Sequence, residues 1–290
     1  MKVRFLRGTT EENNSLTLPA GEISINLDDM SLRLHDGVTQ GGFECPSNMA
    51  FNLGPGPKTL VAGDYQLGYF GEISAAEFIT GDQLTDEMGV SEGVGMNSTT
   101  AWLKFAYQGK ILYVAKQPIR HSVSWETLYQ SGLVYGVDDV GIHPAGANAN
   151  QFSPTLIGTD GFKTRLLTGG NTDPATGAGG EWDQLMVAVT NGTFASLTTT
   201  ELGVGSGNGA TSWVQEAISG TLANRVGRGQ TSIADYDSVA ATTVTATMGW
   251  RPVLELTTVT KILFPPEDIY YETDYVKPSY VYDWSYSDAP

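Results

Sequence analysis

The chain has 290 residues, of which 32 are Asp or Glu and 16 are Lys or Arg, so its formal net charge is −16. Because phosphate binding needs clustered Lys and Arg, and the sequence has no basic patch, we expect no nucleic acid partner. A single cysteine, Cys45, excludes disulfides within the chain and indicates folding in a reducing cytoplasm.

An N-terminal β module for assembly is predicted over residues 1–45. Apolar and polar residues alternate over 16–27 and again over 32–34, and residues 28–31 provide a turn. This pattern predicts a hairpin with one apolar face. Two strands alone can neither hide such a face nor protect their edges, so we expect the hairpin to pack on copies of itself in other subunits.

Residues 46–94 are predicted to form a connector with short strands and helices. Its first part, residues 46–63, is rich in Pro and Gly, which interrupt regular structure. Residues 65–69 have the alternation of a strand, and two acidic stretches, 72–78 and 82–88, indicate short helices.

The main core is predicted within a central domain over residues 95–256, because five of the six tryptophans lie there. The apolar stretches on either side of Gln108-Gly109 predict a hairpin over residues 102–115. Ser124 precedes a short helical pattern that ends at Gly132, which supplies a helix stop. Residues 141–180 and 203–212 are rich in Gly, Asn, Thr and Ser, and we expect them to form displayed loops.

Nine side chains of this domain are the candidates for its structural motif: Trp125, Arg165, Glu181, Trp182, Trp213, Glu216, Arg228, Trp250 and Arg251. The tryptophans are predicted to anchor the core. The arginines, together with Arg225, lie among apolar residues in a chain poor in arginine. We expect them to form partly buried, bidentate bridges with Glu181, Asp183 or Glu216, which constrain loop geometry more than they add stability.

The last segment, residues 257–290, is predicted to be an extended arm. Six acidic residues against two lysines give it a net charge of −4, and it contains eight aromatic residues. Aromatic side chains at this density are rarely left in water. Two arrangements stay open: the arm packs on its own domain, or it docks on a neighbouring subunit.

No catalytic, cofactor or metal site is predicted. The three histidines are far apart and lack metal-site spacing, no GxSxG element is present, and the Gly-rich stretch 203–209 is not followed by a phosphate-binding Lys. Calcium bound by loop carboxylates and a carboxylate pair for sugar cleavage are left open. The N-terminus lacks the apolar stretch of a signal peptide, and no run is long enough for a membrane helix.

Two patterns resemble known families. Residues 18–25 and 32–42 resemble the N-terminal β module of bacteriophage tail fibres and tropism determinants, in which a hairpin of this kind assembles as a trimer. Six further elements stand in the order seen in C-type-lectin-like domains of the formylglycine-generating-enzyme and phage receptor-binding types, namely 118–125, 165–168, 181–183, 213–216, 225–229 and 249–253.

The chain departs from the enzyme branch of that second family in two ways. Twelve residues, 169–180, separate two elements that are nearly contiguous in the enzymes, and the domain lacks their reactive cysteines. The resemblance therefore implies the fold without the oxidase chemistry, and places a long Gly-rich loop at that site.

Residues and resemblance together predict a mainly β fold with a few short helices (α+β), made of the β module, the lectin-like domain and the arm. The predicted function is that of a non-enzymatic bacteriophage virion protein, a fibre, spike or head-decoration component that adheres to the host surface. We expect a homotrimer that contacts other virion proteins and a host glycan or protein, assembled in the host cytoplasm. The alternatives are a capsid or neck cement protein without a host ligand and a tail-associated polysaccharide depolymerase.

Overall fold

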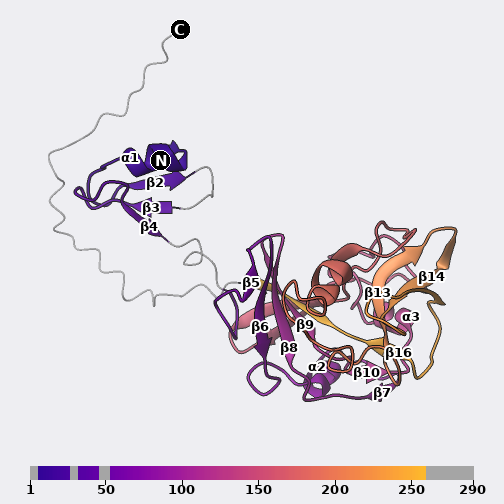
Figure 1. Ribbon diagram of the computed structural model, residues 1–290. Coiled ribbons are helices and arrows are strands. Elements are labelled where there is room, and N and C mark those ends of the chain that lie inside the picture. Colours follow the sequence, from indigo (N-terminus) through magenta and orange to yellow (C-terminus); the bar gives the residue numbers. More distant parts are fainter. Residues whose placement is uncertain (1–5, 27–31, 46–52, 259–290) are drawn as a thin grey trace, which may run out of the picture. The chain divides into compact units, whose positions relative to one another are not determined.

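Three β-sheets and four short helices make up the part of the chain that the computed structural model describes, residues 6–26, 32–45 and 53–258 (Figure 1). The mainly β class predicted from the sequence is thereby confirmed. The predicted C-terminal arm lies outside the described residues from position 259 onward.

The N-terminal module is a four-stranded sheet with one helix. Its strands follow chain order: β1 (Leu6–Gly8), β2 (Ile23–Asn26), β3 (Leu32–Leu34) and β4 (Phe43–Cys45). The predicted hairpin is confirmed, because β2 and β3 pair antiparallel. Helix α1 (Thr10–Ser15) was not predicted, although the sequence carries its signal: Thr9 and Glu12 form a reciprocal capping box.

The two faces of this sheet are used in the opposite way to the usual one. The polar side chains Ser24, Asn26, Arg33 and His35 are buried. Asn26 and Arg33 donate to side chains of α1, for example Asn26 Nδ2 to Thr10 Oγ1 at 2.9 Å, and Ser24 bonds to His35. The apolar side chains of Leu32, Leu34 and Phe43 are 39%, 45% and 56% exposed. The alternation was therefore predicted correctly, but the apolar face is the uncovered one.

A seven-stranded sheet forms one half of the larger part of the chain. Its spatial order is β11 (Ser153–Ile157), β12 (Asp160–Arg165), β17 (Val253–Thr258), β9 (Lys110–Ala115), β8 (Trp102–Tyr107), β6 (Leu67–Ile73) and β5 (Ala62–Gly63). The β8–β9 hairpin confirms the prediction, and Gln108 and Gly109 turn the chain with φ of 50° and 76°. The last strand, β17, lies between β12 and β9, near the middle of the sheet.

A six-stranded sheet forms the other half, with the order β15 (Tyr236–Ala240), β14 (Thr221–Arg228), β13 (Thr211–Ile218), β16 (Met248–Trp250), β10 (Arg120–His121) and β7 (Val94–Gly95). In Figure 1 the long strands β13 and β14 lie at the end of this region opposite β5 and β6. The remaining helical elements are α2 (Gly81–Glu87), α3 (Trp125–Gln130) and a π-helical turn, η2 (Trp182–Val187).

Two of the three predicted helices are present. Ser124 accepts a hydrogen bond from the Thr127 N–H at the start of α3, and Gly132 follows its end with a φ of 74°. Helix α2 confirms the helix predicted over the second acidic stretch, residues 82–88. The helix predicted over residues 72–78 is wrong, because Glu72 and Ile73 pair with β8 and the chain then makes a turn in which the Glu77 N–H donates to Ser74.

All five tryptophans of the predicted core are buried, each at most 1% exposed. Four of them lie in one apolar cluster, and Trp182 lies in a second cluster with residues of β8, β9 and η2. Trp125 and Trp213 make reciprocal contacts: the indole of Trp125 donates to Val214 O at 2.9 Å, and the indole of Trp213 donates to Val123 O at 2.8 Å. These two bonds join the start of α3 to β13, segments about 90 residues apart.

Candidate functional site

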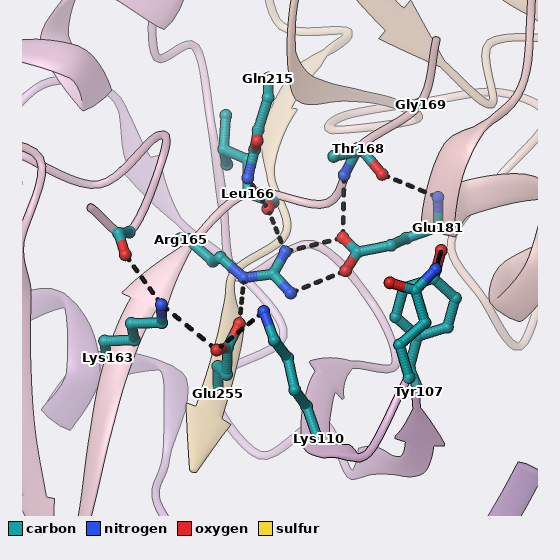
Figure 2. A network of polar contacts seen from close by, with 12 residues as sticks. Tyr107, Lys110, Lys163, Arg165, Leu166, Thr168, Gly169, Glu181, Gln215 and Glu255 are labelled. Atoms are coloured by element: carbon teal, nitrogen blue, oxygen red, sulfur yellow. Dashed lines mark hydrogen bonds and ion pairs between the residues drawn. The ribbon is translucent and has the colours of Figure 1, made fainter. Parts of the chain in front are cut away.

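A buried ion network centred on Arg165 joins β12, β17 and η2 (Figure 2). The guanidinium of Arg165, at the end of β12, donates to both carboxylate oxygens of Glu181 at 2.7 Å. Its Nε donates to Glu255 on β17 at 2.9 Å. Thr168 completes the junction, since its N–H donates to Glu181 and its hydroxyl accepts from the Glu181 N–H. For Arg165, the prediction of a bidentate bridge to Glu181, Asp183 or Glu216 is confirmed, with Glu181 as the partner.

Two lysines share the other carboxylate of this network. Lys110 Nζ and Lys163 Nζ lie 3.3 and 3.2 Å from Glu255 Oε1, and Lys163 also donates to Gly136 O. Burial alone would raise the pKa of Glu255, but Arg165 and the two lysines hold it below its ordinary value. Burial likewise opposes the charge of Arg165, and the two carboxylates outweigh it, so the pKa of Arg165 is raised.

Arg228 on β14 forms a second tie. Its Nη2 donates to Asp183 Oδ1 at 2.5 Å, which confirms the predicted pairing with a carboxylate of the 181–183 element. Four further bonds go to main-chain carbonyls, and the shortest run from Nη1 to Gly169 O at 2.5 Å and from Nε to Asp235 O at 2.6 Å. The guanidinium carbon lies 5.7 Å from the centre of the Trp182 ring.

Arg251 contradicts the prediction of a carboxylate partner. Its guanidinium donates to the carbonyls of Ala115, Lys116 and Leu202 and to the hydroxyl of Ser212. The side chain is fully buried, and burial lowers the pKa of Arg251 to about 9. These four hydrogen bonds take the place of a carboxylate partner. Arg251 therefore connects the main chain at the end of β9 to the segment before Gly203.

Arg225 and Glu216 also lack the predicted pairing. Arg225 lies 4.0 Å from the centre of the Trp125 ring and donates to the carbonyls of Leu222 and His143 at 2.6 and 2.9 Å. Glu216 accepts instead from the Gly169 N–H, at 2.9 and 3.2 Å. The main chain therefore takes the role that the sequence analysis assigned to an ion pair.

The four arginines have one property in common, which is that each donates to main-chain carbonyls. Most of these carbonyls belong to irregular segments, among them Gly169, Leu202 and His143. A guanidinium has five donors in a rigid plane, so a single buried side chain can hold several segments in one geometry. The four arginines thus hold irregular segments against the two sheets, and their donors serve this structural role.

Within the described ranges, no group of three or more His, Cys, Asp or Glu side chains is placed to hold a metal ion. No helix there is long and apolar enough to cross a membrane.

Lys104 is a buried charge that the sequence analysis did not single out. It lies in the middle of β8, donates to Pro55 O at 2.9 Å and to Pro57 O at 2.5 Å, and lies 4.9 Å from the centre of the Phe70 ring. Burial lowers its pKa to about 7, and nearby Lys58 acts in the same direction. The signal in the sequence was a lysine within an otherwise apolar strand.

No protein family model matches the chain, and no curated protein matches it. Among solved structures, the Major Tropism Determinant U1 variant is 14% identical with a TM-score of 0.18, over 89% of this chain and 100% of that chain. The I1 variant is 12% identical with a TM-score of 0.19, over 89% and 100%. Treponema denticola variable protein 1 is 11% identical with a TM-score of 0.21, over 69% of this chain and 99% of that chain.

Proposed function

We propose that this protein is a bacteriophage virion component that assembles with copies of itself through its N-terminal sheet and binds the host surface through loops of its larger part. The observation that carries the proposal is the set of buried arginines that hold irregular segments by their carbonyls. Ligand contacts are often made by loops that a rigid scaffold positions. A binding function explains why so much buried charge serves to fix loops.

The uncovered apolar face of the N-terminal sheet supports the assembly part of the proposal. Leu32, Leu34 and Phe43 lie on adjacent strands of this face, because Leu34 is paired with Phe43 in the sheet. An exposed patch of large apolar side chains marks an interaction surface. The trimer expected from the resemblance would cover three such faces at once, with the larger part of each chain left available to a ligand.

Cell binding tests the adhesion part. The labelled full-length protein is incubated with the bacterial host, and variants with a lysine on an irregular loop, Asn148→Lys and Thr172→Lys, are compared with it. Both positions are exposed, so the fold is expected to tolerate the change. The matched control is Gln66→Lys, an exposed position in the turn between β5 and β6. We expect the loop variants to lose binding and the control to retain it.

Electron microscopy of antibody-labelled particles decides between this function and that of a cement protein. Copies spread over the capsid lattice, together with no binding to host cells, would overturn the adhesion proposal. A depolymerase would instead release reducing ends from host capsule, and the same protein preparation can be assayed for them.

A further inference from the structure

Two irregular segments, residues 136–151 and 169–180, meet beside β13 and β14. The main chain of Ala175 attaches the second segment to β13, since its N–H donates to Ala217 O at 2.7 Å and its carbonyl accepts from the Ser219 N–H at 2.9 Å. The first segment is held at His143, whose carbonyl accepts from Arg225 on β14. The side chains of His143, Asp173 and Glu216 lie at this junction.

An aspartate and a histidine link the two segments directly. Asp173 Oδ1 accepts from the Ala217 N–H at 3.1 Å and lies 3.4 Å from His143 Nε2. The two side chains are only 15% and 19% exposed, and His143 Nε2 has no hydrogen-bond partner among the described residues. A protonated imidazole makes a charged contact with the carboxylate here, whereas a neutral imidazole offers at most an uncharged hydrogen bond.

Glu216 lies on β13 beneath the same segment. Its carboxylate is held by the Gly169 N–H, and the side chain is almost fully buried. Burial raises the pKa of Glu216 to about 7, against the backbone amides of Gly169 and Gly170, and Asp173 raises it further. Burial also raises the pKa of Asp173, whereas the Ala217 N–H, His143 and Arg225 lower it. The two carboxylates therefore oppose each other's ionisation.

The remaining charged or titratable groups that face this junction keep one state around neutral pH. Burial raises the pKa of Tyr135 and of Tyr236, and the charge of Glu216 contributes in both cases. Two guanidinium groups of β14 also face the junction: Arg225, whose pKa burial lowers from a value far above neutral, and Arg228, which donates to Gly169 O. The two carboxylates, whose pKa values burial raises, are left beside the imidazole of His143.

We propose that His143, Asp173 and Glu216 form a proton-dependent latch, which holds residues 169–180 against residues 136–151 and β13 in mildly acidic medium and loosens them in mildly alkaline medium. In acid, Glu216 is neutral and the imidazolium binds Asp173. In alkali, Glu216 gains a buried charge beside Asp173. A folded-state pKa above the unfolded value contributes stability below the unfolded pKa and loses it as the pH rises through the folded one.

Hydrogen exchange on the full chain tests the latch. We expect the protection of peptides from residues 169–180, corrected for the intrinsic exchange rate, to fall roughly tenfold between about pH 5.5 and about pH 8.5, as one pKa unit of coupling implies. Peptides from the β8–β9 hairpin should keep their protection. Glu216→Gln should flatten the pH dependence, and His143→Gln should lose the extra protection in acid. The exposed Glu77→Gln is the matched control and should behave as the wild type.

Equal protection of residues 169–180 at both pH values in the wild type would overturn the proposal. So would a wild-type pH dependence that survives unchanged in His143→Gln. Because His143 is partly exposed, we expect His143→Gln to fold, and this variant tests the latch even if Glu216→Gln does not fold.

Discussion

Replacing Glu181 by glutamine is the sharpest test of the arginine frame. The change keeps the size of the side chain and removes one carboxylate oxygen and the charge. Arg165 would then retain its 2.9 Å bond to Glu255 but would face an amide N–H₂ group, which cannot accept from a guanidinium. The Thr168 N–H, which donates to the same carboxylate, would compete for the remaining oxygen.

The size of the effect follows from the contacts. The wild-type pair has two charge-assisted bonds of 2.7 Å between side chains that are each 6% exposed. Removing one partner of a buried pair costs about 3–5 kcal/mol, because a charge is left without its counter-charge. Since Glu255 still compensates part of the charge, we expect a loss near the lower end, about 3 kcal/mol of unfolding free energy.

Urea unfolding followed by tryptophan fluorescence measures this loss, because the five buried tryptophans all lie in the larger part of the chain. The control is Lys110→Gln, which removes a charge from the same network at a side chain that is 51% exposed. That change should cost less than about 1 kcal/mol. If Glu181→Gln destabilises the protein no more than Lys110→Gln does, the reasoning about the frame is refuted.

Three further outcomes are expected. Leu34→Lys should shift the protein to monomers in analytical ultracentrifugation, whereas Val38→Lys, at a side chain already 83% exposed, should leave its assembly intact. Asp183→Asn should cost about 1.5–3 kcal/mol in urea unfolding, because the Arg228 side chain is 0% exposed and loses the charge of its carboxylate partner, although its bonds to Gly169 O and Asp235 O remain. Burial lowers the pKa of Lys104 to about 7, so between that pH and the ordinary lysine pKa the unfolded chain binds one proton more than the folded chain. The stability of the wild type should therefore rise between about pH 7 and pH 10 in thermal melts, whereas that of Lys104→Met should not.

Local signals predicted the elements that they encode. The hairpin of β8 and β9 was predictable because apolar stretches flank Gln108-Gly109, a pair suited to a two-residue turn. Helix α3 was predictable from its serine cap and its glycine stop. Alternation in the N-terminal module showed which side chains share a face. It could not show which face is covered, because that depends on helix α1 and on any neighbouring chain.

The contacts of the buried arginines were predictable only where the hydrogen-bond partner is a side chain. Arg165 and Arg228 pair with Glu181 and Asp183, two of the three carboxylates that the sequence offered as partners, whereas Glu255 was not predicted. Arg225 and Arg251 bind carbonyls, which every residue carries, so no pattern of residue types marks them. His143 and Asp173 meet through two irregular segments whose paths are set by the rest of the fold.

The position of β17 has a consequence for how the protein is made on the ribosome. This strand is the last described element of the chain, yet it pairs with both β9 and β12 near the middle of the seven-stranded sheet. Until the chain has been translated past residue 258, the edges of β9 and β12 that pair with β17 therefore remain unpaired. Pairings between distant segments form slowly, and unpaired edges invite aggregation. We expect a chain that stops before residue 253 to lack a stable sheet, so that only translation products that include β17 enter assembly.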